Sequence, residues 1–69
     1  MSTDIRKYIR KNFKGADVDE IQESISSSIA EKEEVTLPGL GVFFEILWSN
    51  SDKDEQNHIL NTISDNIKD

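Results

Sequence analysis

The sequence predicts an all-α protein, a small bundle of three to four short helices in a single domain covering residues 1–69. Apolar residues recur every three or four positions, N-capping patterns precede two such stretches, and one central run is apolar around most of a helical circumference. The predicted helices cover about residues 3–14, 17–31, 39–49 and 52–67, and the helix at 39–49 is the hydrophobic centre.

The first predicted helix carries its apolar residues on one face. Ile5, Tyr8, Ile9 and Phe13 recur at the spacing of one helical stripe. Gly15 follows the stripe and is predicted to end the helix in a left-handed conformation, which glycine adopts without steric cost.

Basic residues occupy the opposite face of this first helix. The five bases are Arg6, Lys7, Arg10, Lys11 and Lys14. With one acid they give residues 1–15 a charge of +4, whereas residues 16–69 carry −10 and the whole chain −6. Charged helix faces are usually solvated, but this cluster is also a candidate contact for phosphates or for a partner protein.

The second predicted helix opens on a capping box. Asp17 is followed three residues later by Glu20, so that each side chain can accept from the other residue's backbone N–H. Its apolar stripe consists of Val18, Ile21, Ile25 and Ile29. The helix is predicted to end in the acidic run at 31–34, because carboxylates are unfavourable near the negative end of a helix dipole.

Residues 35–37 are predicted to be an extended connector, because Pro38 disfavours α geometry in the residue before it. The run that follows can be a helix or a strand. Read as a helix, it leaves only Gly41, Glu45 and Ser49 in one polar strip, and a helix so apolar belongs inside a core. The alternative is an α+β protein with a short strand at 41–48, which would have few residues to pair with.

The apolar side chains of this central helix are candidates for the core or for self-association: Leu40, Phe43, Phe44, Leu47 and Trp48. A chain of 69 residues is near the lower limit for folding without disulfides, metals or association. We therefore expect a homo-oligomer, most simply a dimer.

The last predicted helix begins at Ser51 or Asp52, because both have an acid three residues later. Its apolar stripe consists of Ile59, Leu60, Ile63 and Ile67. His58 lies on the opposite face and is interpreted as an ordinary exposed histidine.

No combination of residues points to catalysis, to a metal site or to a cofactor. Cysteine is absent, so a thiolate metal site is excluded. There is one histidine, and the serines are spread along one predicted helix without a partner base, so no activated nucleophile is indicated. We expect no small-molecule substrate. The N-terminus lacks a signal-peptide pattern and no apolar run is long enough to span a bilayer, so the prediction is a cytoplasmic protein without a membrane partner.

Four segments of the chain resemble one known family. They are Ile5-Arg6, Asp19-Glu20-Ile21, Glu33-Glu34 and the long run from Leu37-Pro38-Gly39 to Trp48-Ser49-Asn50-Ser51. In this order they resemble the SspI family of small acid-soluble spore proteins, over nearly the whole chain. The resemblance implies a non-enzymatic minor spore protein, made in the forespore of an endospore-forming bacterium and stored in the spore core.

A second resemblance concerns the segment Leu37-Pro38-Gly39-Leu40-Gly41 after two amphipathic helices. It is similar to the first half of the histone-like HU family, in which such a segment leads into a strand of a DNA-gripping arm. The alternatives to a stored spore protein are therefore a nucleic-acid-associated protein using the basic face of the first helix, and a protein–protein adaptor.

Overall fold

The structure, a computed structural model, describes residues 4–68. Its elements are α1 (Ile5–Phe13), α2 (Val18–Glu31), the short 3-10 helix η1 (Glu34–Thr36), α3 (Leu37–Ser49) and α4 (Lys53–Ile67). The all-α prediction is confirmed. The alternative strand at 41–48 is wrong, because those residues lie inside α3. Residue 3, the predicted start of the first helix, lies outside the described residues.

Capping boxes begin α2 and α4, as predicted. In α2 the Glu20 amide donates to Asp17 Oδ1 at 2.9 Å and the Asp17 amide donates to Glu20 Oε1 at 3.3 Å. In α4 the corresponding bonds between Asp52 and Glu55 are both 2.8 Å. These bonds satisfy amides that a helix start otherwise leaves unpaired.

A residue with positive φ follows each of the first two helices, α1 and α2. Gly15 has φ of 80°, which confirms the predicted left-handed conformation after α1. Lys32 caps the end of α2 with φ of 54° and ψ of 31°. The chain therefore turns out of α2 inside the acidic run, where the sequence predicts the helix to end.

The predicted extended connector before the central helix is wrong. Glu34–Thr36 form a 3-10 turn, and Leu37 is already helical with φ of −61° and ψ of −41°. Pro38 falls in the first turn of α3, where its missing N–H leaves no intrahelical bond unmade. The Thr36 hydroxyl also donates to the carbonyl of Ser28 in α2 at 3.3 Å, which holds this turn against α2.

The central helix α3 is the element against which α1 and α2 pack. Ile9 of α1 and Val42 of α3 are the buried apolar residues of the described chain, each with 7% of its surface exposed. Gly39 allows close approach of the two helices, since a Cβ there would lie 3.6 Å from Ile9 Cδ1. Phe13 and Phe43 meet edge to face, with ring centroids 5.2 Å apart and planes at 76°.

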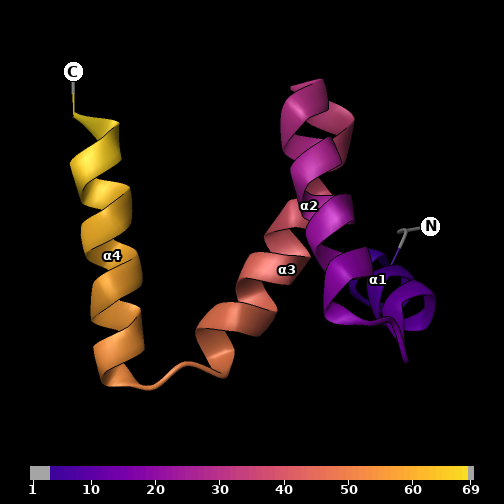
Figure 1. Cartoon of the computed structure of the whole chain (residues 1–69), viewed down its shortest axis with the longest axis horizontal. Coiled ribbons are helices and arrows are strands. Elements are labelled where there is room, and N and C mark those ends of the chain that lie inside the picture. Colours follow the sequence, from indigo (N-terminus) through magenta and orange to yellow (C-terminus); the bar gives the residue numbers. More distant parts are fainter. Residues whose placement is uncertain (1–3, 69) are drawn as a thin grey trace.

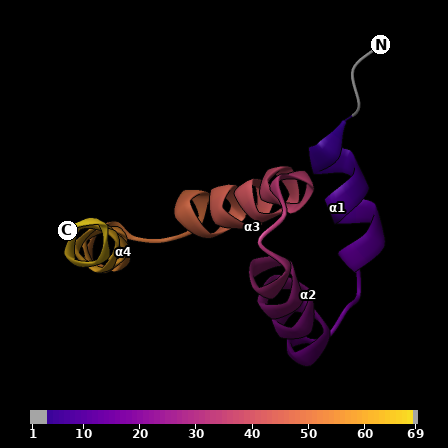
Figure 2. The same ribbon diagram turned by 90° about the horizontal axis from the view of Figure 1, so that it is seen from above.

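The helices form an open U rather than a closed bundle. In Figure 1, α2 and the start of α3 form one arm, the second half of α3 forms the base, and α4 forms the other arm. The view from above agrees, since α4 stands apart from both α1 and α2 (Figure 2). The radius of gyration is 13.5 Å, against about 11 Å for a compact domain of this length.

The expectation that α3 lies inside a core is wrong for a single chain. Val42 is its one buried residue, whereas Phe44 is 43% exposed and Leu47 is 50% exposed. The physical reason is the position of α4, whose apolar stripe points into the open U and does not cover α3. The central helix is therefore only half covered within one copy of the chain.

Two glycines test the backbone geometry. Gly41 lies within α3 with open space around it, so Gly41→Ala should stabilise the fold by about 0.5–1 kcal/mol through the better helix propensity of alanine. Gly15→Ala is the matched comparison and should destabilise the fold, because its φ of 80° strains any side chain. Urea unfolding followed by circular dichroism measures both changes, and a destabilising Gly41→Ala would contradict the helical geometry at this position.

Candidate interaction site

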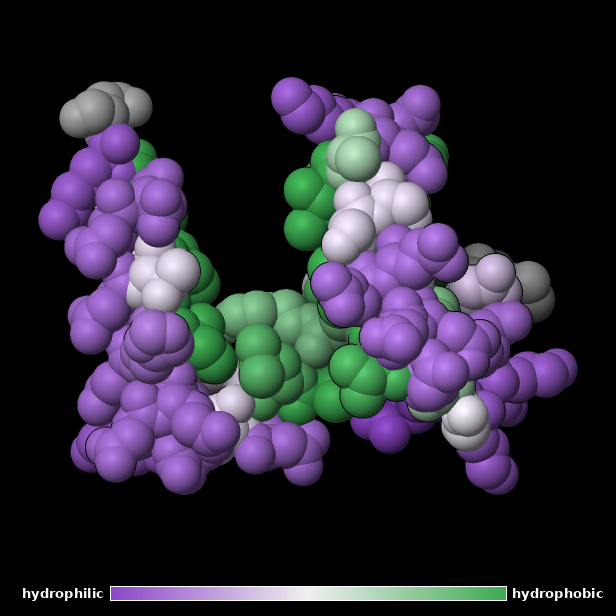
Figure 3. All heavy atoms as spheres, viewed as in Figure 1, coloured by the Kyte–Doolittle hydropathy of each residue, from purple (hydrophilic) through white to green (hydrophobic). Residues whose placement is uncertain are grey.

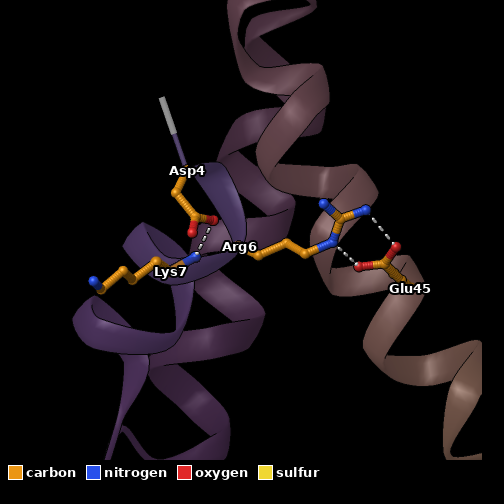
Figure 4. Close-up of polar contacts among 4 residues, drawn as sticks. All are labelled: Asp4, Arg6, Lys7 and Glu45. Carbon is orange, nitrogen blue, oxygen red and sulfur yellow. Dashed lines mark hydrogen bonds and ion pairs between the residues drawn. The ribbon is translucent and has the colours of Figure 1, made fainter. Parts of the chain in front are cut away.

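An ion pair joins α1 to the polar strip of α3. Arg6 Nε donates to Glu45 Oε1 at 2.7 Å and Arg6 Nη2 donates to Glu45 Oε2 at 2.8 Å, which is a bidentate arrangement (Figure 4). The first turn of α1, which carries Arg6, is fixed by Asp4, whose carboxylate accepts from the Lys7 amide at 3.0 Å. The pair therefore sets which side of α3 faces α1.

The pKa values of both partners shift as an ion pair requires. The hydrogen bonds from Arg6 lower the pKa of Glu45, while partial desolvation opposes this and the charges of Arg6 and Arg10 add to it. The hydrogen bond and the charge of Glu45 in turn raise the pKa of Arg6. Both side chains stay largely exposed, so the pair orients the helices more than it stabilises them.

The structure divides the five predicted basic contact residues. Arg6 is engaged by Glu45, whereas Lys7, Arg10 and Lys11 are exposed on α1 and Lys14 is exposed at its C-cap. Of these four, Arg10 and Lys14 stand at the edge of an apolar hollow. The basic face is therefore not one uniform patch.

That hollow lies where α1, α2 and α3 converge, and we call it the apolar groove. It is lined mainly by Phe13 of α1, Ile21 and Ile25 of α2, and Phe43 and Leu47 of α3. Its volume is about 520 Å³ and it is open to solvent along one side.

The predicted core or self-association residues gather beside this groove. Leu40, Phe43, Phe44 and Leu47 line a second hollow together with Ile25. The two hollows share Ile25, Phe43 and Leu47. Trp48 stacks on Phe44, with centroids 5.9 Å apart and planes at 26°. Apolar surface thus covers the floor between the arms of the U, and further apolar surface lies on the facing sides of the two arms (Figure 3).

Sequence reasoning did not assign two parts of this site. The pairing of Arg6 with Glu45 joins residues 39 positions apart, and no local pattern signals such a contact. The groove also contains Phe13, Ile21 and Ile25. The sequence placed these residues on apolar helix faces but did not indicate which surface those faces would contact.

Within residues 4–68, no cluster of three or more histidine, cysteine or acidic side chains is arranged to hold a metal ion. His58 is exposed on α4, and the serines of α2 lie along a helix that carries no histidine. None of the described helices combines the length and apolarity needed to cross a membrane. The features that stand out are therefore an apolar groove and a basic helix, which are surfaces for contact.

These features define a small, acidic, all-helical protein with an exposed apolar groove. The family described as "Small, acid-soluble spore protein I" matches residues 3–67. Proteins of that name from Bacillus mycoides and from Bacillus cereus are each 40% identical over 68 residues, covering 99% of both chains. The chain therefore belongs to the small, acid-soluble spore protein I family, which associates it with sporulation.

The same relationship extends to a protein of that name from Bacillus anthracis, again at 40% identity over 99% of both chains. No solved structure matches the chain significantly. The resemblance to the spore protein family is thus confirmed. The segment likened to the histone-like HU family does not lead into a strand, because Leu37–Ser49 are helical.

The ion pair between α1 and α3 predicts a pH dependence. The pKa of Glu45 is lower in the folded than in the unfolded chain, so its contribution to stability is complete above the unfolded value near 4.5 and is lost as the pH falls through the folded value. In Arg6→Gln, the carboxyl resonance of Glu45 should titrate at higher pH than in the parent chain, as measured by NMR. Lys11→Gln is the matched control, and an unchanged midpoint in Arg6→Gln would contradict the pairing.

Proposed function

We propose that this chain is a non-enzymatic protein made in the forespore and stored in the spore core. The observation that carries the proposal is the family match over residues 3–67, together with relatives of the same length at 40% identity. The family description names a kind of spore protein and no reaction. The acidic composition, with fourteen acids against eight Lys and Arg, is in keeping with that description.

Fractionation of a sporulating culture of the native host tests this proposal. An antibody against the chain should give no signal during vegetative growth and should detect the protein in forespores. The signal should persist in dormant spores stripped of their coat and should be released by dilute acid after breakage. Detection in the mother cell, or loss of the protein with the coat, would contradict storage in the core.

The basic side of α1 supports nucleic-acid binding as a second candidate function. Lys7, Arg10, Lys11 and Lys14 are exposed on a helix of nine residues and its cap, in a chain that is otherwise acidic. Arg6 is engaged by Glu45 and would have to give up that pair to reach a phosphate.

Four phosphate contacts predict that log affinity for duplex DNA falls with log salt concentration at a slope of about −3 to −4. When Lys7, Arg10, Lys11 and Lys14 are replaced by glutamine, the chain should no longer be retained on duplex DNA at low salt. A chain with Lys53→Gln and Lys68→Gln is the control for nonspecific charge effects. Phosphate contacts are strongest at low salt, roughly 20–50 mM. If the parent chain is not retained on duplex DNA in this range, nucleic-acid binding is excluded as a function.

A further inference from the structure

Helix α4 presents an apolar stripe that the described part of its own chain leaves largely uncovered. Leu60 is 50% exposed, Ile63 is 41% exposed and Ile67 is 72% exposed. At about 100° per residue these three residues share one face of α4. Apolar surface lies on the side of the α4 arm that is turned toward the interior of the U (Figure 3). An amphipathic helix with an uncovered stripe has little stability of its own in water and needs an apolar surface to pack against.

The corner between α3 and α4 holds α4 in this outward position. Asn50 Nδ2 donates to the Ile46 carbonyl at 2.8 Å, and Ser51 Oγ donates to the Leu47 carbonyl at 2.6 Å. From the first turn of α4, Gln56 Nε2 donates to the Trp48 carbonyl at 2.9 Å. For α4 to fold back onto its own α1–α2 side, bonds of this corner would have to break, so the uncovered stripe is more readily met by another molecule.

The apolar groove offers a surface of matching character. Its floor is made by aromatic and branched aliphatic side chains of three helices, and its edge carries Arg10 and Lys14. Helix α4 carries three acids and one lysine, so its net charge is opposite to that of the edge. A helix with an apolar stripe and a net negative charge thus fits the groove in both respects.

The surface area indicates how much contact is missing. The accessible area of 6097 Å² exceeds the roughly 4,400 Å² of a compact 7.9 kDa monomer by about 1,700 Å². Burial of this excess on each of two chains would remove about 3,400 Å², which lies within the range of obligate homodimers. The excess is therefore of the size that one dimer interface covers.

We propose that the apolar groove binds helix α4 of a second copy of the chain, and that the exchange is reciprocal. Each copy gives its α4 to the groove of the other, so the dimer has two-fold symmetry and closes without leaving a free groove or a free α4. This interface covers Leu47 and Phe43 of one copy with Ile63 and Leu60 of the other. It is a property of the surface and does not depend on where in the spore the protein is stored.

Sedimentation equilibrium of the parent chain and of two variants tests the proposal. The parent should be a dimer at micromolar concentration. Ile63→Lys places a charge in the apolar contact and should raise the dimer dissociation constant at least about 100-fold. Asn61→Lys adds the same charge on the other side of α4 and should leave the dimer intact. Circular dichroism should show that both variants keep their helices, because neither position is buried within one chain.

Cysteine cross-linking identifies the contact, because the chain has no cysteine of its own. A mixture of Ile63→Cys and Leu47→Cys chains should form a disulfide-linked heterodimer on mild oxidation. A mixture of Asn61→Cys and Leu47→Cys chains should form much less.

Three results would overturn the proposal. The first is a parent chain that stays monomeric at 100 µM, a concentration about a hundred times a micromolar dissociation constant. The second is an assembly larger than a dimer. The third is a dimer in which Ile63→Cys cross-links to Leu47→Cys no better than Asn61→Cys does. If Ile63→Lys lost its helices, Leu60→Lys compared with Asn57→Lys would make the same test on the same stripe.

Discussion

The structure depends on one imbalance, which is that α3 has more apolar surface than the other helices of the same chain cover. Seven of its thirteen residues are Leu, Val, Phe, Ile or Trp between Leu40 and Trp48, yet Val42 is its one buried residue. Burial of apolar area is the main favourable term in folding, and at roughly 25 cal/mol per Å² an uncovered face of this size is a substantial unused contribution. The open U, the groove and the free stripe of α4 all follow from this imbalance.

The contacts of the polar strip of α3 determine which side of this helix faces α1. Glu45 receives Arg6, and the same side of α3 presents Gly39 to Ile9 at close range. Helix α1 therefore packs on the side of α3 that carries Val42 and Glu45, while α2 contacts another part of the apolar surface and the rest remains open. A charged contact that adds little stability still fixes orientation, and this orientation leaves Phe44 and Leu47 exposed. In a chain of only 69 residues, an exposed apolar surface of this kind points to association between copies.

The sequence was sufficient for the local structure and insufficient for the packing. Capping boxes at Asp17 and Asp52 and the left-handed Gly15 were predictable because each depends on residues a few positions apart. The start of α3 was missed, since Pro38 acts as a first-turn residue. The 3-10 turn before it is closed by bonds from Thr36 to the Glu33 carbonyl and also contacts Ser28 of α2. Arg6 was a candidate contact for phosphates or for a partner protein, but its bond to Glu45 arises from the approach of α1 to α3, which helical periodicity does not specify. The outward position of α4 was missed for the same reason.

The central claim is that a second copy of the chain completes the core around α3, and its most direct test is the dependence of thermal unfolding on protein concentration. If folding and association are coupled, each tenfold increase in concentration should stabilise the dimer by about 1.4 kcal/mol and raise the midpoint temperature accordingly. The Ile63→Lys chain should unfold at a lower temperature that does not change with concentration. A midpoint of the parent chain that stays constant between 1 and 100 µM, which is about two decades around a typical micromolar dissociation constant, would contradict the account.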